Sequence, residues 1–303
     1  MVNPATRTGV DSTVSVAAID AIVSLALAED SPWGDITSEL LIPVDAMARA
    51  MLTAREPGVF SGREVFAATM YAVDPEMTVT MLIGDGARFE RADIIARVDG
   101  AARSILRAER VALNFVQRMS GIATTTAAHV TEVVGTNARV VDTRKTTPGL
   151  RALERHAVRC GGGHNHRFSL SDAVLAKDNH LAVLTADGTR DLTTELRGIR
   201  AKMSHTTHFE VEVDRLDQIE SVLAAGIDTI MLDNFSIEDL RTAVAMISGR
   251  ATVEASGNVN LGTIGAIART GVDIISVGAL THSARALDLG LDIVVATPAE
   301  SSP

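Results

Sequence analysis

The chain has 303 residues, of which 46% are apolar but only 3% aromatic, and it carries a formal net charge of −10. This length allows one large α/β domain or two unequal ones, and the aliphatic composition suits parallel strands buried beneath helices. The acidic balance argues against binding to nucleic acid or to an anionic membrane, because both partners select basic surfaces, and the few aromatic side chains offer no stacking platform.

Cys160 is the only cysteine, so the chain cannot form an internal disulfide and a cysteine-based metal site is not expected. The N-terminus lacks the apolar region of a signal peptide, and no apolar run approaches the ~20 residues of a membrane span. We therefore expect a cytoplasmic protein without a membrane segment.

The first part of the chain predicts an α+β domain. Helices are expected over residues 17–28, 64–71 and 101–120, and strands over 47–54, 58–61, 77–82 and 92–98. This pattern predicts a separate N-terminal sandwich domain over residues 1–120. The segment 284–303 is expected to pack back on that domain and to end in a frayed tail from residue 297.

From about residue 139 the sequence alternates short β-branched runs with helical patterns. Strands are expected over residues 139–142, 173–177, 208–213, 229–233, 252–255 and 273–277, and helices over 150–159, 216–225, 237–247 and 261–269. Such alternation implies parallel strands joined by right-handed crossovers. We predict an open or incomplete β/α barrel over residues 121–283; a doubly wound sheet is the alternative, but no strand leads into a G-x-G-x-x-G turn.

A basic island lies between Thr143 and His180 of this acidic chain. It holds seven basic residues against three acidic ones: Arg144, Lys145, Arg151, Arg155, Arg159, Arg167 and Lys177 against Glu154, Asp172 and Asp178. The island is typical of a site for a small, multiply charged anion. Arg151, Arg155 and Arg159 recur every four residues, which favours a solvated helix face for these three.

Two cations follow the first barrel strand in the string VVDTRKTTPG. Arg144 offers a planar fork for a carboxylate and Lys145 a compact charge for a phosphate. Residues just past the carboxyl ends of barrel strands face the active site, although a surface turn with solvated cations is an equal alternative. Pro148 is well placed to open the next helix.

The string RCGGGHNHRFSLSDAVLAKDNH places polar groups on both sides of an apolar strand. Three glycines end a helix and allow a ligand to approach the backbone, and His164, His166 and Arg167 follow. Lys177 closes the strand. The two histidines lack a third ligand at metal-site spacing, so we interpret them as anion contacts or orienting groups.

Carboxylates mark two successive strands. Glu210 and Glu212 share one face of their strand, and Asp233 ends the next one. Glu212 and Asp233 could meet at the barrel mouth and hold Mg²⁺, which prefers oxygen ligands together with substrate phosphates. The alternative is a structural salt bridge to Lys145 or Lys177.

Two late turns, EASGNV and SVGALTHS, have glycine at a strand end before a helix, where backbone N–H groups suit a phosphate. Earlier in the chain, Arg110, Asn114 and Gln117 share one helix face. Their pattern alone favours a solvated surface.

Together these strings resemble the quinolinate phosphoribosyltransferase family. The resemblance is carried, in the family's order, by EDSPWGDITS, ERVALNFVQRMSGIAT, TRKTTPGLRALERHAV, GGGHNHRFSLSDAVLAKDNH, FEVEV, IMLDNF, EASGNV and SVGALTHS. It implies that quinolinate and phosphoribosyl pyrophosphate give nicotinate mononucleotide, pyrophosphate and CO₂ with Mg²⁺, a step of NAD biosynthesis.

The resemblance also implies residue roles. Arg144 and Arg167 would grip the quinolinate carboxylates beside His166, and Lys177 would lie between both substrates. Lys145 would meet the pyrophosphate, and Glu212 and Asp233 would lie near the ribose hydroxyls and the metal. Further substrate contacts are expected from Thr143, Ser256, Gly257, Asn258, Val277, Gly278, Ala279 and His282. Arg110 would enter a neighbouring subunit's active site, which implies a homodimer and replaces the solvated-surface interpretation of that residue.

Three other functions stay open from the residues alone. The first is a paralogous phosphoribosyltransferase with a different acceptor. The second is a Schiff-base aldolase or lyase that uses Lys145 or Lys177. The third is a phosphate-binding module without catalytic activity.

Overall fold

The computed structural model describes residues 14–184 and 191–295, which form two compact units. The first unit consists of the described parts of Met1–Ala127, Thr146–Gly162 and Ala284–Pro303, and the second of Ala128–Lys145 and Gly163–Ser283. The predicted domain bounds, 1–120 and 121–283, stay a prediction. The tail expected to fray from residue 297 lies outside the described residues.

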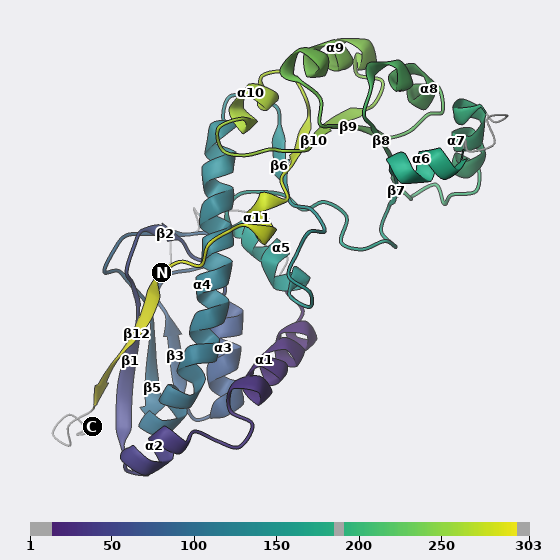
Figure 1. Ribbon diagram of the computed structural model, residues 1–303. Coiled ribbons are helices and arrows are strands. Elements are labelled where there is room, and N and C mark those ends of the chain that lie inside the picture. Colours follow the sequence, from purple (N-terminus) through teal and green to yellow (C-terminus); the bar gives the residue numbers. More distant parts are fainter. Residues whose placement is uncertain (1–13, 185–190, 296–303) are drawn as a thin grey trace, which may run out of the picture. The chain divides into compact units, whose positions relative to one another are not determined.

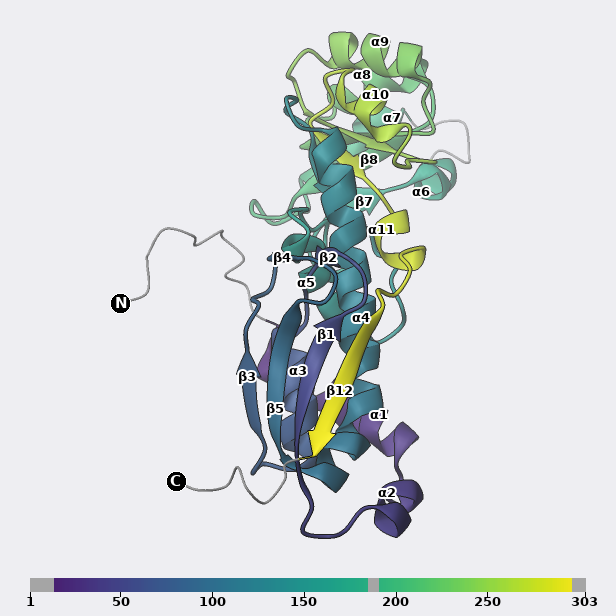
Figure 2. The ribbon, with the colours of Figure 1, turned by 90° about the vertical axis from the view of Figure 1, so that its left-hand side faces the viewer.

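The first unit is built on an antiparallel sheet in the order β12-β1-β5-β3 (Figure 2). Its strands are β1 (Met47–Ala54), β3 (Thr78–Met81), β5 (Ile94–Ala101) and β12 (Leu289–Val295). β12 pairs with β1 from Ala48–Val295 to Ala54–Leu289, so a segment beyond Ser283 supplies an edge strand that the sequence pattern did not predict. The short strands β2 (Gly58–Val59) and β4 (Arg88–Phe89) pair separately.

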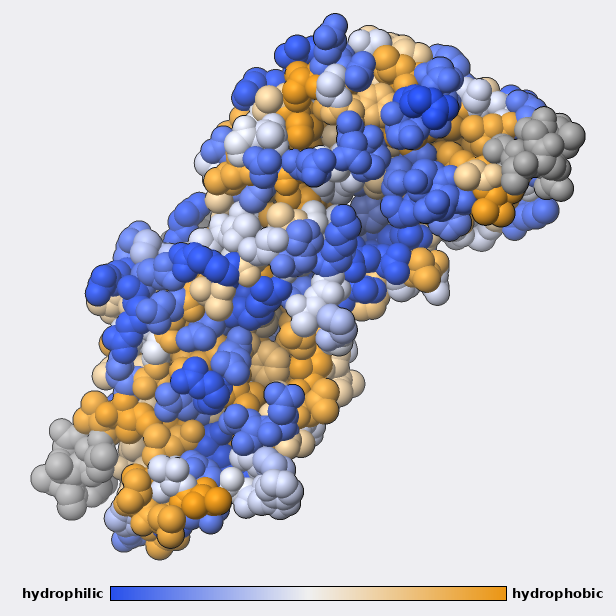
Figure 3. Space-filling model, viewed as in Figure 1, coloured by the Kyte–Doolittle hydropathy of each residue, from blue (hydrophilic) through white to orange (hydrophobic). Residues whose placement is uncertain are grey.

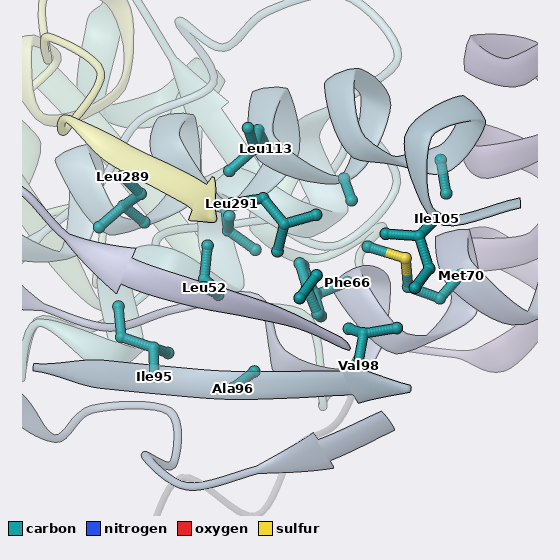
Figure 4. Packing of buried hydrophobic residues seen from close by; sticks show 14 of the residues in the cluster. Leu52, Phe66, Met70, Ile95, Ala96, Val98, Ile105, Leu113, Leu289 and Leu291 are labelled. Atoms are coloured by element: carbon teal, nitrogen blue, oxygen red, sulfur yellow. The ribbon is translucent and has the colours of Figure 1, made fainter. Parts of the chain in front are cut away.

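Helices cover one face of this sheet and close its core. They are α1 (Val16–Asp30), α2 (Ile36–Leu41), α3 (Arg63–Val73), α4 (Ala102–Glu132) and α5 (Arg151–Cys160). Alternate residues of β1 are buried, as expected for a sheet with one covered face. Leu52, Phe66, Ile95, Ile105 and Leu291 belong to one mostly aliphatic cluster, which also includes Phe60 and Phe89 (Figure 4).

The long helix α4 differs from its prediction, which ended it at Ser120. It continues through Gly121 to Glu132, and the chain passes within it from the first unit to the second. A Cβ atom on residue 121 would lie 1.9 Å from the carbonyl oxygen of Arg285. The glycine therefore permits close packing of the helix and does not end it.

The second unit is a sheet of six parallel strands in the order β6-β11-β10-β9-β8-β7 (Figure 1). The strands are β6 (Arg139–Val141), β7 (Val174–Ala176), β8 (Phe209–Val213), β9 (Thr229–Asp233), β10 (Thr252–Ser256) and β11 (Ile274–Ser276). Strands β7 to β11 follow one another in sequence and in space, and β6 pairs with β11. No ladder joins β6 to β7, which confirms the predicted open β/α barrel.

Helices follow the strands of this barrel. They are α6 (Asp178–Leu184), α7 (Leu192–Arg200), the 3₁₀ turn Leu216–Gln218 with α8 (Ile219–Leu223), α9 (Ile237–Ile247), α10 (Ile264–Ala268) and α11 (Ala279–His282). The bounds of α9 match the prediction. The sequence pattern missed α6, which begins directly after Lys177, and also α2, α7 and α11.

A loop occupies the free edge of β6. His164 forms a parallel bridge with Val141: its N–H donates to the Val140 carbonyl at 2.8 Å, and its own carbonyl accepts the N–H of Asp142 at 3.1 Å. Because an uncovered edge would leave these backbone groups unpaired, the bridge fixes the loop against the barrel opening.

A buried polar network lies in the first unit beside α3. Asp85 Oδ1 accepts the backbone N–H groups of Gly62 and Arg63, which begin α3, and Oδ2 lies 2.8 Å from His156 Nε2. Burial disfavours charge on this imidazole, but hydrogen bonds with Asp85 and Cys160 outweigh it and raise the pKa of His156 to about 10. The network therefore ties α5 to the start of α3 by a charged pair.

This network predicts a pH dependence of stability. The folded pKa of His156 lies above its ordinary value of 6.5, so its contribution is complete below about pH 6.5 and is lost as the pH rises through about 10. The unfolding free energy of the unmodified protein should fall more between these pH values than that of His156→Gln, measured by urea titration. His205→Gln, a change at an exposed histidine, is the control. Parallel curves for the protein and His156→Gln would contradict the assignment.

Candidate active site at the open barrel

The carboxyl ends of the six parallel strands bring most predicted site residues to one edge of the sheet. Thr143, Arg144 and Lys145 follow β6, Lys177 follows β7, Glu212 lies near the end of β8, Asp233 ends β9, Ser256 ends β10, and Val277 and Gly278 follow β11. Parallel strands place these ends side by side, which is where barrel enzymes carry their active sites.

Lys177 and Glu212 form the central ion pair of this edge. The Lys177 ammonium lies 2.6 Å from Glu212 Oε2, and Glu212 is buried whereas Lys177 remains half-exposed. The structural alternative, a salt bridge from Glu212 to a nearby lysine, is therefore realised with Lys177. A hollow of about 720 Å³ lies beside the pair and is lined by Glu212, Asp214 and Asp233 among others.

The turns after β9 and β10 are locked together. Asn234, Gly257 and Asn258 all have positive φ angles, of 58°, 92° and 50°. The Asn258 side chain donates to Asn234 Oδ1 at 3.0 Å, and the Asn234 N–H donates to the Ser256 carbonyl at 3.0 Å. A Cβ atom on residue 257 would lie 2.2 Å from Asn234 Oδ1, so only glycine fits this turn.

The turn after β11 packs against the turn after β6. The Thr281 hydroxyl donates to the Lys145 carbonyl at 2.8 Å, and a Cβ atom on Gly278 would lie 3.1 Å from both Lys145 Cδ and His282 Nε2. The basic turn and the second glycine turn are thus held together, as a shared anion site requires. Ala279 begins α11 beside them.

His166 lies deeper in the barrel, in a cluster with two buried carboxylates. Its Nε2 is 3.2 Å from Glu210 Oε2 and 3.5 Å from Glu254 Oε2. The fully buried Asp142 accepts the backbone N–H of His166 at 2.8 Å and the Asn165 side chain at 2.6 Å. Burial disfavours a charged imidazole, but the two carboxylates outweigh it and raise the pKa of His166.

Sequence reasoning missed Asp142 and Glu254 as parts of this site. Asp142 stands within the string VVDTRK, directly before the basic turn, and Glu254 begins EASGNV. Their signal was available: each is an acidic residue within or at the end of an otherwise apolar strand, and a buried carboxylate requires a partner.

Arg144 and Arg167 are half-buried and close enough to influence each other. Burial lowers the pKa of Arg167, the positive charge of Arg144 lowers it further, and Glu210 and Asp172 oppose the shift. The Arg167 guanidinium donates to the Ala173 carbonyl at 2.9 Å. Two neighbouring guanidinium groups repel until an anion joins them, so the pair is suited to a ligand with two carboxylates.

Other predicted residues lie apart from this cluster. His164 is exposed and does not share the ring contacts of His166. Arg151, Arg155 and Arg159 are half-buried on α5 in the first unit, so the prediction of a solvated face was wrong. Gln117 of α4 donates to the Leu289 carbonyl at 2.7 Å, whereas Arg110 and Asn114 are exposed.

Two further features of the described residues bear on metals and membranes. Among the described residues, the groups of three donors within 4.8 Å of one another are His166 with Glu210 and Glu254, and Asp85 with His156 and Cys160. Glu212 and Asp233 belong to neither group. Within residues 14–184 and 191–295, every helix is too short or too polar to cross a membrane.

Comparison with known proteins gives this site a family. Residues 35–120 match the family described as quinolinate phosphoribosyl transferase, N-terminal domain, and residues 122–292 match its C-terminal domain. A curated relative named nicotinate-nucleotide pyrophosphorylase [carboxylating] from Mycobacterium leprae (strain TN) is 43% identical over 275 residues, or 88% of this chain and 94% of the relative. A relative from Bacillus subtilis (strain 168), named a probable enzyme of this kind, is 36% identical over 88% of this chain and 90% of its own length.

Solved structures agree with the sequence comparisons. The crystal structure of NadC from Streptococcus pyogenes has a TM-score of 0.89 and 39% identity, and the match covers 94% of this chain and all of that one. The nicotinate-nucleotide pyrophosphorylase from Francisella tularensis gives a TM-score of 0.86 at 38% identity, over 93% of this chain and 98% of its own. With both domain matches in order and similar folds throughout, this chain belongs to the quinolinate phosphoribosyltransferase family of enzymes.

Proposed function

We propose that this protein transfers the phosphoribosyl group of phosphoribosyl pyrophosphate to quinolinate and releases pyrophosphate and CO₂, giving nicotinate mononucleotide. The observation that carries the proposal is the pair of neighbouring arginines, Arg144 and Arg167, beside the carboxyl ends of an open barrel. Quinolinate has two adjacent carboxylates, and two guanidinium forks match them in charge and shape.

The phosphorylated donor binds against the turns next to the Arg144 and Arg167 pair. Its 5′-phosphate lies against the two glycine turns, where Ser256, Gly257, Asn258, Val277, Gly278, Ala279 and His282 contribute. The Gly257 turn is rigid and lacks a side chain that would block a phosphate, which supports this placement. Lys145 meets the pyrophosphate, and Lys177 lies between the two substrates.

The chemistry needs positioned charges and no protein nucleophile. The pyridine nitrogen attacks the anomeric carbon as the bond to pyrophosphate breaks, and positive charge develops on the ribose ring. The Glu212 and Asp233 carboxylates stabilise that charge, while Lys145 and Lys177 stabilise the departing anion. The bond to the 2-carboxylate then breaks, CO₂ leaves, and the electron pair stays on the ring carbon, stabilised by the adjacent cationic nitrogen until that carbon takes a proton.

A divalent cation fits the donor set of this edge. Glu212 and Asp233 line one hollow and offer oxygen ligands of the kind Mg²⁺ prefers, and two protein carboxylates suffice where substrate phosphates supply the rest. Mg²⁺ bound there would neutralise charge on the pyrophosphate. The Lys177–Glu212 ion pair favours a metal held chiefly through substrate or water.

A homodimer completes the site in this proposal, with Arg110 reaching the neighbouring active site. Arg103 and Arg107 of α4 bind the Ile42 carbonyl and the Ser31 hydroxyl, but Arg110, farther along α4, has no hydrogen bond or ion pair within the described residues. Figure 3 shows apolar side chains gathered over α2. Those exposed on α2 and its flanks include Trp33, Ile36, Leu40, Leu41 and Val44. A second copy of the chain would cover such a surface.

Two further parts of the proposal concern location and chemical class. The single cysteine is buried and free, which suits a cytoplasmic enzyme. The ion pair of Lys177 with Glu212 opposes the Schiff-base alternative, because an amine must lose its proton before it can attack a carbonyl.

The direct test is one incubation with quinolinate, phosphoribosyl pyrophosphate and Mg²⁺. We expect nicotinate mononucleotide, pyrophosphate and CO₂ in equal amounts, and product formation should stop when a chelator removes Mg²⁺ and return when it is restored. A reaction with another acceptor only would identify a paralogous transferase. An adduct on Lys145 or Lys177 that borohydride traps would identify a Schiff-base enzyme in place of the proposed transferase. Binding of the donor without any turnover would identify a phosphate-binding module without catalytic activity.

The shared site predicts complementation between inactive variants. Arg110→Ala and Arg167→Ala should each lose most activity, because each lacks one cationic contact to substrate. The refolded mixture of both variants should regain about a quarter of the native rate, since one of the two sites in a heterodimer is intact and about half of the dimers are mixed. Arg241→Ala, a change at another exposed arginine, is the control. No recovery after mixing and refolding together would exclude a contribution of Arg110 to the neighbouring site.

A further inference from the structure

Both ring nitrogens of His166 are engaged by the protein itself. Nδ1 accepts the backbone N–H of Arg167 at 2.8 Å, and Nε2 lies between Glu210 Oε2 at 3.2 Å and Glu254 Oε2 at 3.5 Å. The ring therefore has no nitrogen left to exchange a proton with a substrate.

The two carboxylates are held in a protein interior. Glu210 and Glu254 are 4% and 2% exposed, and within the described residues the Oε1 atom of each is buried without a hydrogen-bond partner. Burial raises the pKa of Glu210, and the negative charge of Glu254 raises it further.

This arrangement argues against a metal ion at the same three residues. A metal at Nε2 would need the lone pair of that nitrogen, but Glu210 and Glu254 favour a protonated ring and raise the pKa of His166 to about 10. Nδ1 already accepts the Arg167 N–H. The cluster is instead a clamp on the ring, and the next residue along the chain is Arg167.

We propose that Glu210 and Glu254 are positioning residues, which hold Arg167 in place for the acceptor's carboxylate through the ring of His166, and that His166 keeps its protonation state during turnover. The inference deepens the proposed function and rests on it for the identity of the acceptor. Asp142 contributes from the other side, since it holds the backbone N–H of His166. Arg167 then has its backbone fixed by the ring and its guanidinium fixed by the Ala173 carbonyl.

Electrostatics alone makes the opposite prediction, which gives the proposal a sharp test. Glu210 and Glu254 add negative charge near a pair of arginines that binds an anion. If they acted only through charge, their removal would strengthen acceptor binding. If they act by position, their removal weakens it, because a misplaced guanidinium loses its two-point contact. The sign of the change in acceptor affinity therefore separates the two accounts.

The clamp also makes His166 insensitive to pH near neutrality. The other titratable groups close to it come from several elements: Asp142 and Arg144 after β6, Arg167 and Asp172 on its own loop, and Arg139, His208 and Asp273 along the cavity of about 1030 Å³ that the cluster lines. Of these, only His208 ordinarily titrates between about pH 6 and about pH 9. His208 is exposed at the start of β8.

The first measurement is ¹⁵N NMR of the His166 ring in the full-length protein without substrates, assigned by comparison with His166→Gln. We expect no titration of the ring from about pH 6 to about pH 9, because the two carboxylates raise the pKa of His166 to about 10. In Glu210→Gln/Glu254→Gln the ring should titrate near its ordinary pKa of ~6.5. A native ring that titrates near that value would overturn the clamp, and this result needs neither a variant nor the proposed reaction.

The second measurement is steady-state kinetics of the same double variant. The KM for quinolinate should rise by about tenfold or more, while the KM for phosphoribosyl pyrophosphate stays within about twofold. Glu220→Gln, a change at an exposed glutamate paired with Arg250, is the matched control and should leave both constants unchanged. An unchanged or lower KM for quinolinate in a folded double variant would refute the positioning role. Absence of turnover in the native protein would instead refute the proposed function and leave the NMR result standing.

Discussion

The free edge of β6 determines where the site forms. Because β6 pairs with β11 on one side only, its other edge would leave backbone groups without partners at the opening of the barrel. The loop that contains His164 pairs with that edge. The buried Asp142 holds the same loop, because it accepts hydrogen bonds from Asn165 and His166. This single attachment brings the basic turn after β6 and the polar residues after α5 together, although they are about twenty positions apart in sequence. The groups proposed to bind an anion thus meet at the opening in the sheet.

Strand β8 divides the charges of the site into two layers. Glu210 and Glu212 point to the same face, two residues apart, and each serves a different cationic group: the deeper one contacts His166 and the outer one contacts Lys177. The deep layer is proposed to fix geometry, whereas the outer layer faces the hollow proposed to take the substrate phosphates. In the proposed reaction, one strand therefore separates the groups that position the acceptor from those that stabilise charge during transfer.

The sequence predicted the barrel and most of the edge residues because both follow from local pattern. Each barrel strand is a short apolar run, and a charged or glycine-containing turn comes directly after it. Hydrophobic periodicity and turn residues are therefore enough to predict these strands and the residues at their ends. Other features depended on contacts distant in sequence. β12 is a strand because it pairs with β1, and Gly121 lies within α4 where the Arg285 carbonyl packs closely against the helix. Asp142 and Glu254 belong to the site because the fold brings His166 to them. The helix face of Arg151 was predicted as solvated because its spacing is polar, yet neighbours in the first unit half-bury it.

The central claim is that two arginines, positioned by the covered edge of β6, read two adjacent carboxylates. The most direct test compares quinolinate with nicotinate, which keeps the ring and one carboxylate but lacks the other, as acceptors in the same assay with phosphoribosyl pyrophosphate. The account predicts that kcat/KM for quinolinate exceeds that for nicotinate by at least about a thousandfold, because nicotinate offers only one of the two carboxylates that Arg144 and Arg167 are proposed to contact. Comparable values of kcat/KM for the two acceptors would contradict it.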